Sequence, residues 1–158
     1  MAVDVFLKLG DIKGESKDSK HAGEIDVLSW SWGVSQTGSM GHGGGGGAGK
    51  ANFTDLNIMH AVDKASPVLM SKCATGEHIK EATLVSRKAG KGQQEYMIVK
   101  MKEVFVTSVQ QSGSSEHPTE SVSLAFSHVD LEYKPQKADG SLDAGVHFMY
   151  DLKARKDS

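Results

Sequence analysis

The sequence lacks several features that would assign a small protein to a class at once. Its single cysteine, Cys73, cannot form an intrachain disulfide, so the fold must be held together by an apolar core. The formal net charge is only -2, and no run of five like charges occurs, which argues against a nucleic-acid or anionic-membrane surface. No stretch approaches the roughly 20 apolar residues of a membrane span. The N-terminal segment alternates and carries Asp4, so we expect no cleaved signal peptide.

The length of the chain suits one domain of ordinary size. At 158 residues it can bury roughly 68 to 70% of the surface that its unfolded form exposes. No internal repeat and no composition break divides the sequence. We therefore expect a single domain over residues 1–158, interrupted by an extended glycine-rich loop over residues 37–50.

Most of the chain has the alternating pattern of β-strands. Apolar and polar residues alternate over residues 3–9, the period of two that is typical of a half-buried strand. The segment from Glu24 to Val34 also alternates, and we expect Leu28, Trp30 and Trp32 to face a core. Further strands are predicted over residues 51–60, 80–87, 95–101, 103–111, 119–133 and 146–153.

One segment has the signals of a short helix over about residues 66–75. Ser66 suits an N-cap, Pro67 suits the first helical position, and Gly76 suits a C-terminal cap. We expect Lys72 to face solvent. The expected buried stripe consists of Val68, Leu69 and Cys73. Many short strands and one helix together predict a mainly β fold, either a closed barrel or two packed sheets.

The glycine-rich run contains most of a phosphate-binding pattern. Gly44 is followed after four residues by Gly49 and Lys50, as in G-x-x-x-x-G-K-[S/T]. A working phosphate-binding loop directly follows a strand, leads directly into a helix, and ends with Ser or Thr. Here the preceding strand ends about ten residues upstream, residue 51 is alanine, and the following segment alternates like a strand. The resemblance to that motif is a coincidence of low complexity.

Nothing else in the sequence predicts catalysis or a cofactor. The seven histidines show no i, i+4 or H-x-H spacing and have no cysteine pair to join them, so we expect no metal site. There is no G-x-S-x-G motif, and Cys73 lies on the expected helix, where a small buried residue is the ordinary explanation. We therefore predict no catalytic residues and no cofactor.

Five segments occur in a specific order along the chain: "MAVDVFLKLGDIKGESKD", "EIDVLSWSWGVSQTGSM", "GGGGGAGK", "SRKAG" and "YKPQKADG". In this order and with similar spacing, over residues 1 to about 151, they resemble the Hcp (hemolysin-coregulated protein) family. The members of that family are the inner-tube proteins of bacterial type VI secretion systems.

The resemblance implies a β-barrel of two packed antiparallel sheets with one short helix. Six copies would close into a ring, and rings would stack into a tube that carries small effectors in its lumen and is propelled by a sheath. The expected partners are further copies of the chain, sheath and tip proteins, and the effectors. The protein would be made in the cytoplasm, secreted without a cleaved signal peptide, and would not be an enzyme. The alternative is a monomeric β-barrel that binds a small apolar ligand.

The resemblance also implies which residues face the lumen and which contact other subunits. Small uncharged side chains would leave a channel wide and only mildly adhesive, and those expected there are Ser29, Ser31, Ser112 and Ser115. Holding a long glycine-rich loop in one shape is costly, so we expect it to become ordered against a neighbouring subunit or ring. The expected contact residues are Gly43, Gly44, Gly45, Gly46, Gly47 and Lys50.

Overall fold

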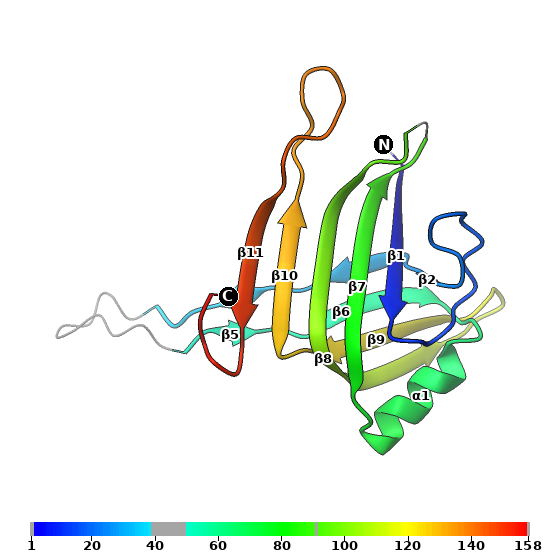
Figure 1. Cartoon of the computed structure of the whole chain (residues 1–158). Helices are drawn as coiled ribbons and strands as arrows, with labels where there is room; N and C mark the ends of the chain where they lie inside the picture. Colours follow the sequence, from blue (N-terminus) through cyan, green and yellow to red (C-terminus); the bar gives the residue numbers. More distant parts are fainter. Residues whose placement is uncertain (1, 39–49, 91, 158) are drawn as a thin grey trace.

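The computed structural model describes residues 2–38, 50–90 and 92–157, which form eleven strands and one helix (Figure 1). The predicted mainly β architecture with a single short helix is confirmed. The elements are β1 (Val3–Leu9), β2 (Ile25–Asp26), β3 (Ser29–Ser31), β4 (Val34–Ser35), β5 (Asn52–Phe53), β6 (Leu56–Ala61), α1 (Ser66–Thr75), β7 (Ile79–Lys88), β8 (Glu95–Ser112), β9 (Thr119–Ala125), β10 (His128–Tyr133) and β11 (Val146–Asp151).

The strands form two antiparallel sheets that share β8. Sheet A has the order β2-β1-β7-β8-β10-β11, and sheet B has the order β3-β6-β9-β8. The strands β4 and β5 pair separately as a short ribbon. In Figure 1 the upright strands of sheet A cross the more horizontal strands of sheet B, with α1 at the lower end. The predicted barrel of two packed antiparallel sheets is therefore observed.

Strand β8 differs from the expectation of two separate strands. It runs for 18 residues without a break, and it bends at Glu103, whose φ of 51° lies in the left-handed region. Up to Val104, β8 pairs with β7 and β10 of sheet A, and from Phe105 onward it pairs with β9 of sheet B. The expected single strand over residues 119–133 is in turn divided into β9 and β10, because the chain crosses from one sheet to the other between them.

The segment from Glu24 to Val34 also changes sheet, and this corrects one predicted core residue. Ile25 in β2 is fully buried beside β1, whereas β3 pairs with β6 of sheet B. The alternation shifts by one residue at this corner, and Leu28 is 65% exposed instead of buried. Trp30 and Trp32 pack against the core as expected, although each stays partly exposed.

The core lies between the two sheets and takes its residues from the inward face of each strand. In sheet A the register aligns Leu7, Leu84 and Val99 across β1, β7 and β8, and all three are almost completely buried. Leu56 and Leu124 face them from sheet B. Burial of each such side chain contributes about 1.5 to 3 kcal/mol, so this alternation accounts for much of the stability.

Helix α1 has the predicted bounds, but its start differs from the prediction. Gly76 ends the helix with a φ of 72°, as expected of a C-terminal glycine. The N-cap is Ala65 and not Ser66, whose hydroxyl accepts the Asp63 N–H at 3.1 Å and is buried. Leu69 is buried as predicted and Cys73 is partly buried. Val68 is 40% exposed, because it lies on the flank of the helix, so its predicted place in the buried stripe is wrong.

Candidate functional site

Two rows of residues on the solvent side of sheet B carry no charge. Residues directly opposite each other on neighbouring strands form two rows across the sheet. Each of them is exposed or half-buried. We call these eight residues the sheet B outer face: Ser31, Asn57, Ser123 and Ser108 in one row, and Ser29, Met59, Ser121 and Gln110 in the other.

This face follows from strict alternation in β6 and β9. In β6, the buried residues Leu56, Ile58 and His60 alternate with exposed ones, and β9 alternates in the same way. Turning every second side chain inward leaves uncharged residues outward, most of them short and polar. Because the backbone ladders fix the register, these side chains stand side by side on four strands.

Hydrogen bonds join the first row across three strands. The Ser108 hydroxyl donates to Ser123 Oγ at 3.0 Å, and the Ser123 hydroxyl donates to Asn57 Oδ1. These bonds partly satisfy the polar groups within the surface itself. A carboxylate, Asp55, lies beside the row just before β6, where it accepts a hydrogen bond from Thr107 Oγ1 at 2.6 Å.

The structure brings three of the four predicted serines onto this side of sheet B. Ser29 and Ser31 lie on β3, the edge strand. Ser112 is exposed at the end of β8, opposite Thr119, one row beyond Gln110. Ser115 is exposed in the turn between β8 and β9, outside the rows.

Six residues of this face were not predicted from the sequence. They are Asn57, Met59, Ser108, Gln110, Ser121 and Ser123. The alternation in residues 56–61 and 119–125 was a sufficient signal for most of them, because a polar residue between two buried ones must point outward. Of the predicted contact residues, Gly43 to Gly47 lie outside the described residues, and Lys50 is exposed. Their roles stay predictions.

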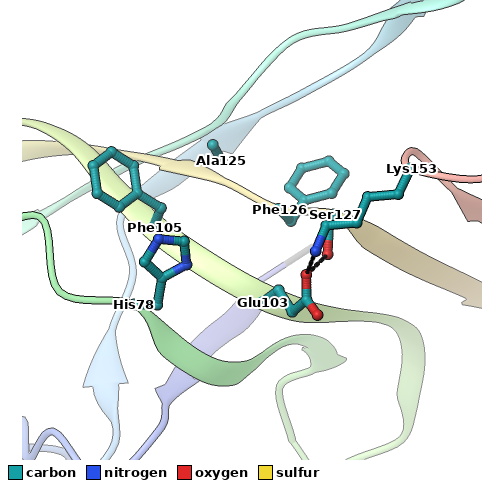
Figure 2. A pocket seen from close by; sticks show the side chains of 7 residues that line it. All are labelled: His78, Glu103, Phe105, Ala125, Phe126, Ser127 and Lys153. Carbon is teal, nitrogen blue, oxygen red and sulfur yellow. Dashed lines mark hydrogen bonds and ion pairs between the residues drawn. The ribbon is translucent and has the colours of Figure 1, made fainter.

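A shallow hollow of about 310 Å³ lies at the bend of β8, and Figure 2 shows the side chains around it. Glu103 Oε2 accepts the Ser127 hydroxyl at 2.8 Å and pairs with Lys153 Nζ at 2.5 Å. The hydrogen bond from Lys153, together with that from Ser127, lowers the pKa of Glu103. Because both side chains of this ion pair are largely exposed, it links the C-terminal segment to the bend only weakly.

The most buried charges of sheet A hold a strap, which we define as residues 13–24. Arg87 donates to both carboxylate oxygens of Asp18, and to Asp4 at 3.3 Å. The Arg87 hydrogen bond holds the pKa of Asp18 far below its usual range. His21 stacks on Phe6, with ring centroids 4.4 Å apart. The strap is therefore fixed to β1 and β7 by charge and by an aromatic contact.

The part of the chain that the structure describes holds neither a cluster of metal ligands nor a membrane-spanning helix. Among those residues, no group of three or more His, Cys, Asp and Glu side chains is arranged to hold a metal ion. No helix there is long and apolar enough to cross a membrane.

Comparison with known proteins identifies the class of this β-barrel. The family model described as "Type VI secretion system effector, Hcp" matches residues 6–133, so the chain belongs to the Hcp family. The protein hcp1 of Pseudomonas aeruginosa strain PAO1 is 55% identical over 148 residues, which cover 92% of this chain and 91% of that protein.

Solved structures give the same result. The crystal structure of Hcp1 from Salmonella typhimurium is 40% identical with a TM-score of 0.83, and the match covers 100% of both chains. A structure described as a type six secretion system protein is 30% identical with a TM-score of 0.92, covering 99% of this chain and 100% of that one.

The resemblance inferred from the sequence is thus confirmed. The chain is a tube protein of the type VI secretion system, in a family of secreted proteins known for hexameric rings. The comparisons do not favour the alternative of a monomeric barrel for a small apolar ligand.

Proposed function

We propose that this chain forms a six-membered ring whose channel is lined by the sheet B outer face. The observation that carries the proposal is the absence of charge from both rows of that face, in a protein whose residues are 24% charged. A channel wall that bore charge would bind oppositely charged cargo tightly and repel the rest. Short uncharged side chains allow cargo to bind weakly and to leave.

The outer faces of the two sheets differ in the way that this orientation requires. The outward side of sheet A carries Lys100, Lys102, Asp130 and Glu132 on β8 and β10. A charged face is suited to the outside of a tube, where it meets water and the surrounding sheath. We therefore assign sheet A to the exterior and sheet B, with Ser29, Ser31, Ser112 and Ser115, to the lumen side.

The chain acts in this proposal as a structural protein and not as an enzyme. It works as one domain over residues 1–158, and its partners are further copies of itself, the sheath and tip proteins, and small effectors held in the lumen. It is made in the cytoplasm and is exported with its cargo, without removal of a signal peptide.

The glycine-rich segment has a separate role in assembly. We propose that Gly43, Gly44, Gly45, Gly46, Gly47 and Lys50 contact a neighbouring subunit or the next ring. Glycine lets two backbones approach closely, because it has no side chain. Deletion of residues 43–47 should leave the melting transition nearly unchanged and impair tube formation. A deletion variant that forms tubes as readily as the parent would remove this role.

The central test measures both the ring and its channel. Light scattering should give the mass of six subunits, whereas the mass of one would support the small-ligand barrel. Replacing both Ser31 and Ser115 with glutamine should narrow the channel and weaken binding of a co-expressed small effector, while the ring persists. Ser71→Gln, on the exposed side of α1, is the matched control. Unchanged effector binding would remove the two serines from the channel wall.

A further inference from the structure

One residue of the sheet B outer face is chemically unlike the others. Met59 is the only apolar side chain among the eight residues of its two rows, and it is 42% exposed. Its direct neighbours across the strands are Ser29 and Ser121. An exposed methionine is unremarkable by itself, but here every side chain around it in the rows is polar and uncharged.

The fold fixes the outward direction of Met59. Ile58 and His60 on either side of it are buried, so Met59 cannot turn inward without displacing a core residue. Its carbonyl oxygen accepts the Leu28 N–H at 2.7 Å, which ties this point of β6 to the edge of the sheet. The backbone is therefore held, while the unbranched thioether side chain can adapt to different surfaces.

The surroundings of Met59 determine what kind of surface it can contact. A charged group of a partner would lose hydration against this face and would find no opposite charge in either row. An apolar side chain would gain by covering the exposed part of Met59. The face thus matches a partner surface that is uncharged and that presents an apolar side chain.

We propose that Met59 is the residue through which the channel recognises cargo, and that it selects effectors with an uncharged, partly apolar surface. The inference rests on the proposed function, which places sheet B in the lumen. In a ring of six subunits the same contact occurs six times around one cargo molecule. A contact that is weak alone becomes effective by this repetition, because binding at one subunit raises the local concentration at the next.

The chain supplies matched controls for a test. Met70 on α1 and Met149 on β11 are each 39% exposed, a fraction similar to the 42% of Met59. Both lie on other surfaces of the protein. The probe is Nile red, an uncharged apolar dye whose emission strengthens when it binds. It is titrated into the parent and into Met59→Ser, Met59→Leu and Met70→Ser, at low and at high salt. Peroxide oxidation followed by mass spectrometry then reports how fast each methionine reacts with and without the dye.

The proposal expects three results. Affinity for the dye falls about tenfold in Met59→Ser, and is kept in Met59→Leu and Met70→Ser. Salt leaves the affinity unchanged, since no charge contributes. The dye protects Met59 from oxidation, while Met70 and Met149 react at their former rates. Parent-like binding by Met59→Ser, or equal losses in Met59→Ser and Met70→Ser, would overturn the proposal.

The same samples separate this inference from the proposed ring. A light-scattering mass of one subunit would contradict the ring, but the dye would still show whether Met59 is an apolar contact. A six-subunit mass, together with a dye affinity that is unchanged in Met59→Ser, would support the ring and reject the inference about Met59.

Discussion

His60 and Glu120 face each other across β6 and β9 and form a hydrogen-bonded pair that has no exposed surface, with His60 Nε2 2.8 Å from Glu120 Oε1. Gln111 on β8 donates to the other carboxylate oxygen at 2.7 Å. On the far side of the imidazole, Asp63 Oδ2 lies 3.7 Å from Nδ1, which has no hydrogen-bond partner. Burial raises the pKa of Asp63. A polar network thus replaces apolar packing at this end of sheet B.

Removal of one partner of this pair should destabilise the fold strongly. We expect His60→Leu to lower the free energy of unfolding by about 3 kcal/mol, because the buried Glu120 carboxyl would keep only the hydrogen bond from Gln111. The double variant His60→Leu, Glu120→Leu should recover most of that loss. Urea denaturation gives the free energy of unfolding of the parent, the single variant and the double variant. Met59→Ala, on the solvent side of the same strand, is the control. A single variant as stable as the parent would contradict the pairing.

The strap should be sensitive to a single methyl group. A Cβ at Gly14 would lie 2.5 Å from the backbone oxygen of Glu24, at the base of the strap, where neither group can move freely. We expect Gly14→Ala to cost about 1 to 3 kcal/mol. Gly33→Ala is the control, because a Cβ there meets nothing within 4 Å. Equal melting temperatures for the two variants would show that the strap can shift without cost.

The contact between Arg87 and Asp18 predicts a loss of stability in acid. The pKa of Asp18 is below its ordinary value of 3.8 in the folded protein, so its contribution is fully present above about pH 4 and is lost as the pH falls further. The melting temperature of Asp18→Asn should therefore lie below that of the parent near neutral pH. The difference should shrink below about pH 3. A difference that does not depend on pH would exclude the charge as its cause.

His147 on β11 should contribute to stability with the opposite dependence on pH. Its Nδ1 lies 2.9 Å from Asp130 and its Nε2 lies 3.1 Å from Glu132, both on β10. The hydrogen bond to Asp130 raises the pKa of His147 above 6.5, so this contribution is present below about pH 6.5 and is lost as the pH rises through the raised value. His147→Gln should lower the melting temperature slightly near pH 5.5 and have no effect near pH 9. Because the side chain is 45% exposed, added salt should reduce the effect.

Local signals in the sequence were sufficient for the helix and for most strands. Pro67 and Gly76 bound α1 because each has a backbone preference that acts within one or two residues. Alternation found β1 and β6 for the same reason, although the strand predicted over residues 51–60 is divided into β5 and β6. The bend of β8 at Glu103 was not predictable in this way, since it depends on pairing with strands far away in the chain. Leu28 was misplaced because the corner before β3 shifts the alternation.

The candidate site was predicted only in part. Ser29 and Ser31 stood out because they alternate with Trp30 and Trp32, whose burial is easy to infer. Met59 did not, because a methionine in an alternating segment suggests a core residue until the register of β6 is known. The composition of a surface formed by four strands depends on their order, and strand order results from contacts between distant segments.

Because β8 belongs to both sheets, it also determines how the protein unfolds. Its first half is hydrogen-bonded within sheet A and its second half within sheet B, so neither sheet can open completely without breaking a ladder that includes this strand. Partial opening is therefore confined to the strap and the edges, and amide hydrogens in the middle of β8 should exchange with solvent only when the whole molecule unfolds. When force is applied to one end of a subunit, we therefore expect the two sheets to deform together and not to separate.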